Sequence, residues 1–184
     1  VAIKAQYPGA DLALRSDLRQ IERLANVVAP LAGGVDVVTI SRELAARIAE
    51  EVDYTLEAQH QAQAAEAFAG DAEFVVPRVH EATPRVLISD WLDGRKLTTA
   101  AESPTEVRNR VGLSYVRFLF AGPARAGLLH ADPHPGNYLV LPDGRLGVVD
   151  FGLVARLPEG LPSAMGRLIR LAIDDDADAM TAGL

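Results

Sequence analysis

The stretch that most constrains the fold is a stiff polar loop followed at once by two short apolar segments. The loop reads HADPHPGN, residues 130–137, and its two prolines and glycine exclude a regular helix. The next segment, YLVLPDGRLGVVDFG at 138–152, has strand-like runs on either side of Pro142-Asp143-Gly144, which predicts a β-hairpin. The chain must therefore hold an irregular loop, rich in polar side chains, directly before paired strands.

Patterns of apolar residues predict strands and helices in the rest of the chain. The expected strands are residues 1–8, 73–80 and 85–92, and the expected helices are 11–28, about 41–68, about 103–120 and much of 159–184. SPTEV at 103–107 is a strong helix start, because Ser103 can cap the helix and Glu106 completes a capping box. This mixture predicts an α+β fold.

Composition and charge restrict the class of protein and its partners. With 49% hydrophobic and 23% charged residues among 184, the chain is globular in composition. Its net charge of -7 argues against non-specific binding of nucleic acid, which needs a basic surface. No apolar run approaches the ~18 residues of a membrane span, and VAIK is not a signal peptide. The absence of cysteine suits a reducing compartment, and we expect a cytoplasmic protein.

Four polar features follow one another in the order that phosphoryl transfer requires. Such sites need a cation on the nucleotide phosphates, oxygen ligands for Mg²⁺ and a carboxylate beside the acceptor. Protein-kinase-like proteins supply them as a strand lysine, its glutamate partner, H-x-D-x-x-x-x-N, and Asp-Phe-Gly after a hairpin. Here Lys4, Glu57, Asp132 with Asn137, and Asp150 stand in that order. The spacing predicts that Asn137 and Asp150 hold Mg²⁺ and that Asp132 faces the acceptor.

Simpler explanations exist for each feature taken alone. A lysine after Val-Ala-Ile and a lone Asp-Phe-Gly turn are both common, whereas the loop, hairpin and Asp-Phe-Gly in succession are specific. A zinc site at His130, Asp132 and His134 would lack a second ligand cluster, because His60 and His80 are isolated in the sequence. We therefore expect His130 to brace the loop.

The acidic stretch around residue 53 is either a solvated helix face or one side of the site. Asp53 and Glu57 are four residues apart on one helix face, with Glu50 close to the same stripe. Glu51 would lie about 240° around the helix from Glu57 if the helix were continuous. We expect Glu57 to pair with Lys4 and Asp53 to point towards the same polar cavity.

VAIKAQYPG, EEVDYTLEA, HADPHPGN and VVDFGLVARL together resemble the UbiB or aarF-domain atypical kinases of ubiquinone biosynthesis. The resemblance covers nearly the whole chain and implies ATP and Mg²⁺ as cofactors. It implies Lys4, Glu57 and Asp132 as catalytic residues, and Asn137 and Asp150 as metal ligands. The implied nucleotide-binding residues, with Ala2 and Leu139 around the adenine and 90–92 as the hinge, are Ala2, Lys4, Glu51, Asp53, Asp90, Trp91, Leu92 and Leu139.

The resemblance also implies a two-lobe, protein-kinase-like fold that is truncated at both ends. Residues 1–92 would form a partial N-lobe, with the lysine strand, an inserted helix, the acidic helix and two strands. Residues 93–184 would form a partial C-lobe, with the catalytic loop, the hairpin and terminal helices. The Lys-x-Gly-Gln segment and alanine-rich loop that the family carries upstream are absent, so we expect a chain that lacks the first N-lobe strands and binds ATP poorly when isolated.

The sequence favours an atypical kinase or ATPase that binds Mg-ATP. After Asp-Phe-Gly the chain enters LVARLPEGLP and a helix, without the long Ser/Thr-rich loop that would present a protein substrate. The expected acceptor is a small or lipid-like molecule, or water, and the resemblance places it in isoprenoid-quinone or lipid metabolism. Missing segments could attach the full-length protein peripherally to the inner face of a membrane. Two alternatives stay open: a small-molecule phosphotransferase of the aminoglycoside or choline kinase type, and a catalytically silent, nucleotide-binding pseudokinase scaffold.

Overall fold

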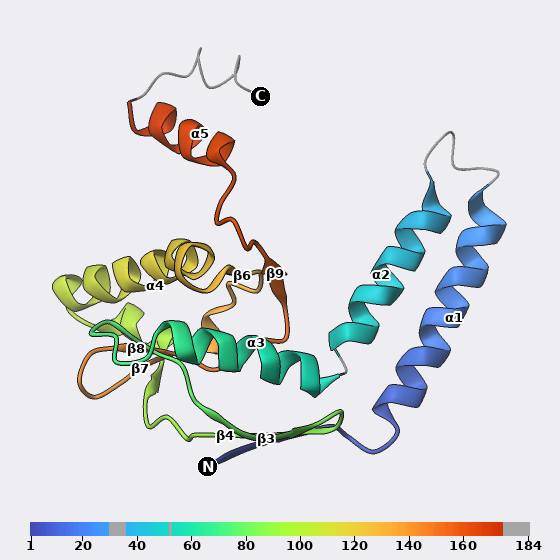
Figure 1. Cartoon of the computed structure of the whole chain (residues 1–184), viewed down its shortest axis with the longest axis horizontal. Coiled ribbons are helices and arrows are strands. Elements are labelled where there is room, and N and C mark those ends of the chain that lie inside the picture. Colours follow the sequence, from blue (N-terminus) through green and yellow to red (C-terminus); the bar gives the residue numbers. More distant parts are fainter. Residues whose placement is uncertain (30–35, 52, 175–184) are drawn as a thin grey trace. The chain divides into compact units, whose positions relative to one another are not determined.

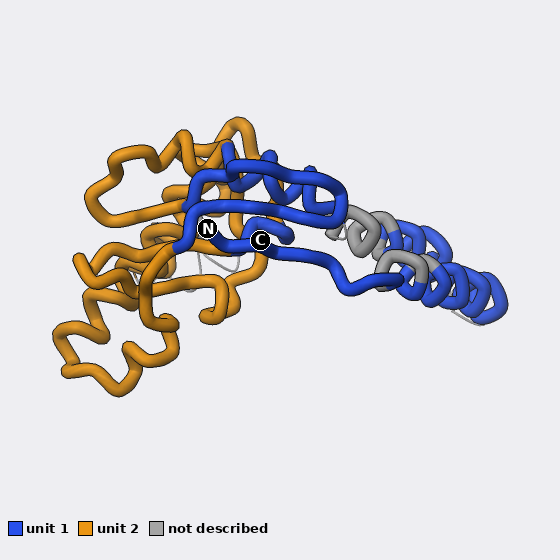
Figure 2. The backbone as a smooth tube through the Cα atoms, turned by 90° about the horizontal axis from the view of Figure 1, so that it is seen from below, with its two compact units in different colours: residues 1–62, 77–91, 150–153 blue, residues 63–76, 92–149, 154–184 orange. Residues whose placement is uncertain are grey.

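The computed structural model describes residues 1–29, 36–51 and 53–174, which mix helices with short strands (Figure 1). The chain forms two compact units, coloured separately in Figure 2. Unit 1 contains residues 1–62, 77–91 and 150–153, and unit 2 contains residues 63–76, 92–149 and 154–184. Each unit is thus built from separate stretches of sequence. The division into an N-lobe, residues 1–92, and a C-lobe, residues 93–184, stays a prediction.

Unit 1 is built on a three-stranded antiparallel sheet. Its order is β1-β4-β3, with β1 at Ala2–Ala5, β4 at Val86–Ser89 and β3 at Val79–Thr83. Lys4 lies opposite Leu87 in the register of β1 and β4. Because side chains alternate along a strand, Ala2 and Lys4 share the half-buried face while Ile3 is 66% exposed. The three predicted strand segments therefore contain strands, and they place Lys4 on the inner face.

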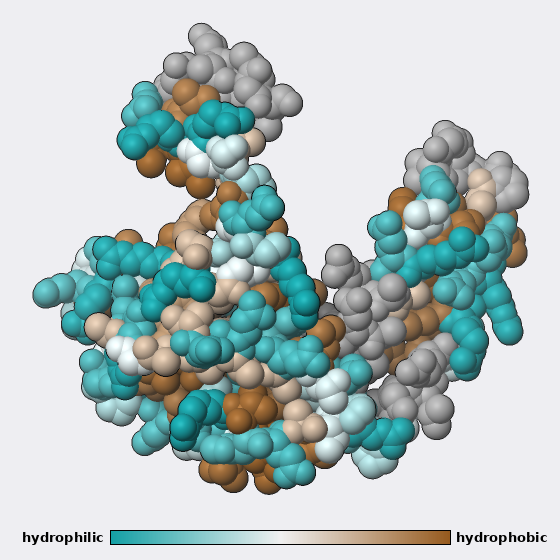
Figure 3. Space-filling view, in the orientation of Figure 1, coloured by the Kyte–Doolittle hydropathy of each residue, from teal (hydrophilic) through white to brown (hydrophobic). Residues whose placement is uncertain are grey.

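Two helices, α1 at Ala10–Val28 and α2 at Val37–Glu51, follow β1 and pack against each other in unit 1. The predicted helix at 11–28 is confirmed, and α2 joins it in a helical hairpin. Leu18 of α1 is buried, whereas Leu24 and Val27 are 64% and 70% exposed. Figure 3 shows apolar and hydrophilic side chains side by side on the surface of this hairpin.

The prediction of one continuous helix over about 41–68 was wrong. Helix α2 ends at Glu51, and a separate helix, α3, spans Tyr54–Ala67; residue 52 lies outside the described residues. Asp53 starts the second helix: its Oδ1 accepts from the backbone N–H of Thr55 at 2.9 Å, and its backbone carbonyl accepts from Leu56 at 3.1 Å. An aspartate that satisfies free N–H groups of a first helical turn favours a new start. The angular difference expected between Glu51 and Glu57 therefore does not apply.

Unit 2 holds the predicted hairpin within a four-stranded sheet of order β2-β8-β7-β5. The strands are β2 at Phe74–Val75, β8 at Leu146–Val148, β7 at Tyr138–Val140 and β5 at Arg95–Lys96. The turn between β7 and β8 closes through Gly144, whose N–H donates to the carbonyl of Leu141 at 2.9 Å. Gly144 has φ +86°, which glycine adopts at little steric cost. A second pair, β6 at Leu128–His130 and β9 at Val154–Arg156, flanks this hairpin in sequence.

The helical elements of unit 2 surround these strands in sequence. They are η2 at Leu97–Glu102, α4 at Thr105–Ala126, η3 at Pro135–Asn137 and α5 at Ser163–Ile173. Ser103 does not cap α4 as predicted, because Pro104 occupies the N-cap position and no side chain caps there. Ser103 instead closes the preceding 3₁₀ turn, with its N–H donating to Ala100. The predicted helix within 159–184 extends past residue 174, and that part lies outside the described residues.

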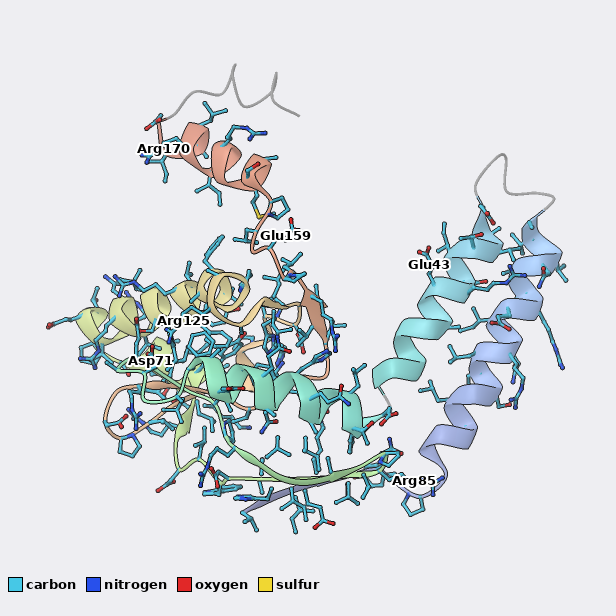
Figure 4. All side chains as sticks on the ribbon, in the orientation of Figure 1. Glu43, Asp71, Arg85, Arg125, Glu159 and Arg170 are labelled. Carbon is cyan, nitrogen blue, oxygen red and sulfur yellow. The ribbon has the colours of Figure 1, made fainter. Side chains whose placement is uncertain are left out.

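The core of unit 2 is aromatic. Phe68, Phe74 and Phe118 are each no more than 4% exposed, and their ring centroids lie 5.3 to 5.6 Å apart. Asp71 and Arg125, labelled in Figure 4, tie the turn after α3 to α4 through a 2.6 Å hydrogen bond. None of the described helices is long and apolar enough to cross a membrane.

Candidate active site

Three of the predicted residues converge in unit 1. The Nζ of Lys4 donates to both carboxylate oxygens of Glu57, each at 2.8 Å, and to Oδ2 of Asp150 at 3.1 Å. Lys4 comes from β1, Glu57 from the first turn of α3, and Asp150 from the segment that follows β8. The predicted pairing of Lys4 with Glu57 is therefore present, although the two residues are 53 positions apart in sequence.

The electrostatics of this cluster differ between its members because their exposure differs. The side chain of Glu57 is 3% exposed, whereas those of Lys4 and Asp150 are 41% and 35% exposed. Burial raises the pKa of the Glu57 carboxyl, and the hydrogen bond and charge of Lys4 offset this in part. Burial acts to lower the pKa of Lys4, but the bonds and charges of Glu57 and Asp150 outweigh it, so its pKa is raised. Lys4 is thus a permanent cation held between two carboxyl groups.

Neighbouring groups fix the two carboxylates. Oδ1 of Asp150 accepts from the N–H of Gly152 at 2.9 Å, which closes the turn at Asp-Phe-Gly. The backbone of Phe151 donates to Glu57. A Cβ added at Gly152 would lie 3.2 Å from Oδ1 of Asp150, tighter than an ordinary contact. The glycine therefore lets the main chain approach the carboxylate closely. The centroid of the Tyr54 ring lies 5.1 Å from Nζ of Lys4.

The catalytic-loop residues form a second cluster, which lies in unit 2. The carboxylate of Asp132 accepts from the N–H of His134 at 3.2 Å through Oδ1 and from Nδ2 of Asn137 at 2.8 Å through Oδ2. The Nδ1 atom of His134 accepts from the N–H of Gly136. This bond caps the start of the short η3 helix. The N–H of Val149 donates to the carbonyl of Asn137, which ties the loop to the end of β8. The loop therefore holds Asp132 from two sides.

The orientation of Asn137 bears on metal binding. Because its NH₂ group donates to Asp132, its side-chain oxygen points away from that bond and stays an acceptor. Amide and carboxylate oxygens are the hard ligands that Mg²⁺ prefers, usually completed by phosphate oxygens and water. No three His, Asp or Glu side chains of the described ranges gather as a metal cage. Asn137 and Asp150 each present an oxygen of this kind, and their binding of Mg²⁺ stays a prediction.

The remaining predicted nucleotide-binding residues are placed as follows. Asp53 is engaged by Thr55 at the start of α3, and the side chain of Glu51 lies outside the described residues. Ala2 lies in β1 and Leu139 in β7. Their contacts with a nucleotide stay predictions.

The predicted hinge, residues 90–92, coincides with a boundary between the compact units. The boundary falls between Trp91 and Leu92. Trp91 is 69% exposed, and Asp90 accepts from Nε2 of His80 at 2.7 Å. Burial acts to raise the pKa of the Asp90 carboxyl, but hydrogen bonds from His80 and Arg78 outweigh it and hold this pKa below its usual value. Whether these residues contact an adenine stays a prediction.

Three site residues were not found from the sequence. Tyr115 donates to the carbonyl of Pro133, inside the loop, from helix α4. The side chain of His134 caps η3, and the backbone N–H of Gly152 donates to the carboxylate of Asp150. Gly152 could have been found, since it belongs to the Asp-Phe-Gly motif, but Tyr115 belongs to none of the motifs and had no local signal. His130 is buried, with its ring centroid 5.6 Å from that of Tyr138, which agrees with a bracing role.

A strand lysine paired with a helix glutamate, and an H-x-D-x-x-x-x-N loop before a hairpin that ends in Asp-Phe-Gly, define a kinase-like chain. Residues 1–183 match the family model of the ABC1 atypical kinase-like domain. The chain therefore belongs to this family, also called UbiB or aarF-domain kinases, as the motifs indicated.

Relatives in plants and bacteria agree with this assignment. The chain is 30% and 32% identical to Protein ACTIVITY OF BC1 COMPLEX KINASE 3 and KINASE 1, both chloroplastic, of Arabidopsis thaliana, over 98% of its own length. It spans 26% and 27% of these two proteins. A solved structure of Rv3197 from Mycobacterium tuberculosis, in complex with erythromycin, is 41% identical with a TM-score of 0.88. That match covers 98% of this chain and 46% of Rv3197.

Proposed function

We propose that the chain binds Mg-ATP and transfers or hydrolyses its terminal phosphoryl group. The observation that carries the proposal is the contact of Lys4 with both oxygens of Glu57 and with Asp150. A lysine held by a glutamate is positioned to contact nucleotide phosphates, and the Asp of Asp-Phe-Gly is the usual ligand of the accompanying metal. Membership of a kinase-like family supports the same conclusion.

In this proposal each residue has a role that follows from the chemistry of its side chain. Lys4 contacts the phosphates, and Glu57 orients it. Asn137 and Asp150 would hold Mg²⁺, which neutralises charge on the phosphates when it is bound. Asp132, whose two oxygens are fixed by His134 and Asn137, accepts the proton of the attacking hydroxyl or water. Ala2, Leu139 and residues 90–92 contact the base and ribose in the proposal, and Glu51 and Asp53 complete the polar side of the site.

The acceptor and the location belong to the same proposal. The segment after Asp-Phe-Gly passes from β9 through Pro158 and Pro162 directly into α5, and a long substrate-presenting loop does not intervene among the described residues. A small or lipid-like acceptor, in isoprenoid-quinone or lipid metabolism, or water, fits this short connection. We propose a cytoplasmic protein, attached peripherally to the inner face of a membrane through segments of a longer parent chain.

Because we expect the isolated chain to bind ATP poorly, the proposal is tested by turnover of the 184-residue chain at saturating ATP, with and without Mg²⁺. Asp132→Asn should retain Mg-ATP affinity within about twofold and lower turnover by at least ~100-fold, as loss of a general base does. Asp17→Asn, which changes an exposed aspartate on α1, is the matched control and should turn over like the wild type. Equal turnover in wild type and Asp132→Asn would refute the role of Asp132.

The acceptor needs a second experiment. Phosphate transfer from labelled ATP is measured with lipid and quinone precursors, choline, aminoglycosides and protein substrates in parallel. Transfer to choline or an aminoglycoside would favour a small-molecule phosphotransferase, whereas Mg-ATP binding without turnover would favour a pseudokinase scaffold. Efficient transfer to proteins would refute the expected acceptor class.

Macrolide binding is a second candidate function, favoured by the erythromycin complex of a protein 41% identical to this chain. Calorimetry of erythromycin with the chain, with and without Mg-ATP, tests it. No heat of binding at millimolar erythromycin would remove this candidate and leave the phosphoryl-transfer proposal untouched.

A further inference from the structure

Helix α4 makes a contact with the catalytic loop that none of the motifs includes. The hydroxyl of Tyr115 donates a 2.5 Å hydrogen bond to the carbonyl of Pro133. The half-buried ring of Tyr115 packs edge-on against Tyr138, with centroids 4.8 Å apart and an angle of 86°. Burial, assisted by the charge of Asp132, raises the pKa of Tyr115, so its hydroxyl keeps the proton that it donates. Both ends of this side chain are thus fixed.

The carbonyl held by Tyr115 belongs to the same peptide group as the N–H of His134. That N–H donates to Oδ1 of Asp132 at 3.2 Å. A peptide group is planar and trans, so fixing the direction of its C=O fixes the direction of its N–H. The ring of Pro133 also restricts φ before this peptide. A C=O that accepts a hydrogen bond polarises its peptide, which strengthens the bond that the N–H donates.

The other contacts of Asp132 originate within the loop itself. Asn137 donates to Oδ2 of Asp132 at 2.8 Å, and the loop turns through the bond between His134 and Gly136. Tyr115 differs because it reaches the loop from α4, whose neighbouring residues Val111 and Phe118 are buried in unit 2. Tyr115 therefore connects the loop, by a hydrogen bond, to a helix that packs in the core of unit 2.

We propose that Tyr115 is a positioning residue for Asp132: it sets the direction of the Asp132 carboxylate through the Pro133–His134 peptide. The kinetic part of this inference rests on the proposed phosphoryl-transfer function, whereas the geometric part does not. Tyr115 does not touch the phosphates or the metal in this role. Its loss therefore slows the step in which Asp132 accepts a proton and leaves nucleotide binding intact.

Tyr115→Phe tests the inference, because it keeps the ring and removes the hydroxyl. Tyr138→Phe is the matched control: it changes the other ring of the pair, is fully buried, and its hydroxyl makes no hydrogen bond among the described residues. Both variants of the 184-residue chain are compared with wild type by ATP turnover, Mg-ATP calorimetry and amide hydrogen exchange.

The expected results separate positioning from general weakening. Tyr115→Phe should lower kcat by about 3- to 10-fold, the effect of one lost hydrogen bond, with the KM and Kd for Mg-ATP within about twofold. Exchange of the His134 amide should quicken by about the same factor, while the amides of β7 and β8 keep their rates. Tyr138→Phe should match wild type in all of these measurements.

Failure of the inference and failure of the proposed function give different results. If the wild type turns over ATP and Tyr115→Phe has the same kcat, the positioning role is refuted and the function stands. If the wild type does not turn over ATP, the proposed function fails and the His134 amide decides: an unchanged exchange rate refutes the inference, and a selective increase supports it. A uniform increase across unit 2, or a loss of Mg-ATP affinity equal to the loss of kcat, would also refute it.

Discussion

The ion pair between Lys4 and Glu57 should respond unequally to the removal of its two members. Glu57 is 3% exposed, whereas Lys4 is 41% exposed and also contacts Asp150 at 3.1 Å. Lys4→Met leaves a buried carboxylate without its cation. Glu57→Gln leaves an ammonium group that keeps Asp150 and water, and it removes the cost of burying a charge. The lysine variant should therefore be the less stable one.

The magnitudes follow from the burial of each group. Removing one partner of a buried ion pair costs about 3–5 kcal/mol. Because Lys4 is partly exposed and water screens the pair, we expect about 2–3 kcal/mol for Lys4→Met at neutral pH. Glu57→Gln should change the free energy of unfolding by no more than about 1 kcal/mol, since a neutral amide of the same shape replaces the buried charge. The double variant should be more stable than Lys4→Met.

The cost of Lys4→Met should depend on pH in a defined direction. Burial raises the pKa of Glu57, and Lys4 opposes that rise, so removing Lys4 raises the pKa further. The penalty of the unpaired carboxylate exists above this folded-state pKa and disappears as pH falls through it, when Glu57 takes up a proton. The stability difference between wild type and Lys4→Met should thus be largest at pH 7 to 8 and shrink towards pH 5.

Urea unfolding of wild type, both single variants and the double variant, at pH 7.5 and pH 5, measures these differences as a double-mutant cycle. Equal losses in the two single variants, or additive losses in the double variant, would show that Glu57 and Lys4 are not coupled as the structure indicates. A cost of Lys4→Met that grows towards pH 5 would refute the electrostatic reasoning.

Two further predictions concern the metal and the core of unit 2. Asp150→Asn should weaken Mg-ATP binding at least ~10-fold in calorimetry, because a metal ligand loses its charge while the bond from Gly152 can persist; unchanged affinity would remove Asp150 as a ligand. Asp71→Asn should cost about 1–3 kcal/mol in urea unfolding at pH 7, because its carboxylate accepts from Arg125 and from the N–H groups of Glu73 and Phe74. Burial opposes these bonds, but together they lower the pKa of Asp71 below its usual value of 3.8, so the cost should begin to shrink below pH 3.8 and disappear as pH falls through the folded-state pKa; a cost that does not shrink between pH 7 and pH 2 would contradict it.

The hairpin and the polar residues of the site could be predicted from short stretches of the sequence. The hairpin at 138–152 was readable because a Pro-Asp-Gly turn separates two apolar runs, and Gly144 has the positive φ that such a turn needs. The order of Lys4, Glu57, Asp132, Asn137 and Asp150 predicted the polar residues of the site, and their roles stay predictions. The pairing of Lys4 with Glu57 followed from that order, and the structure contains it.

Other features depend on packing or on competing local bonds, which the sequence pattern does not reveal. The apolar spacing from 41 to 68 predicted one helix, yet Asp53 bonds Thr55 and starts a new helix there. Ser103 was a plausible cap, but Pro104 takes that position. Tyr115 meets Pro133 through tertiary folding, 18 residues away in sequence, so spacing alone could not predict the contact.

The central proposal is that Lys4, Glu57, Asp132, Asn137 and Asp150 serve one bound metal–nucleotide complex. Mn²⁺ accepts the same oxygen ligands as Mg²⁺ and broadens nuclear magnetic resonance signals of nearby groups. The most direct measurement is a titration of the labelled chain with Mn-ATP that follows the Gly152 backbone amide and the Asn137 side-chain amide. The account predicts that both signals broaden together, at the same Mn-ATP concentration. Broadening of one signal without the other, or of neither at saturating Mn-ATP, would contradict it.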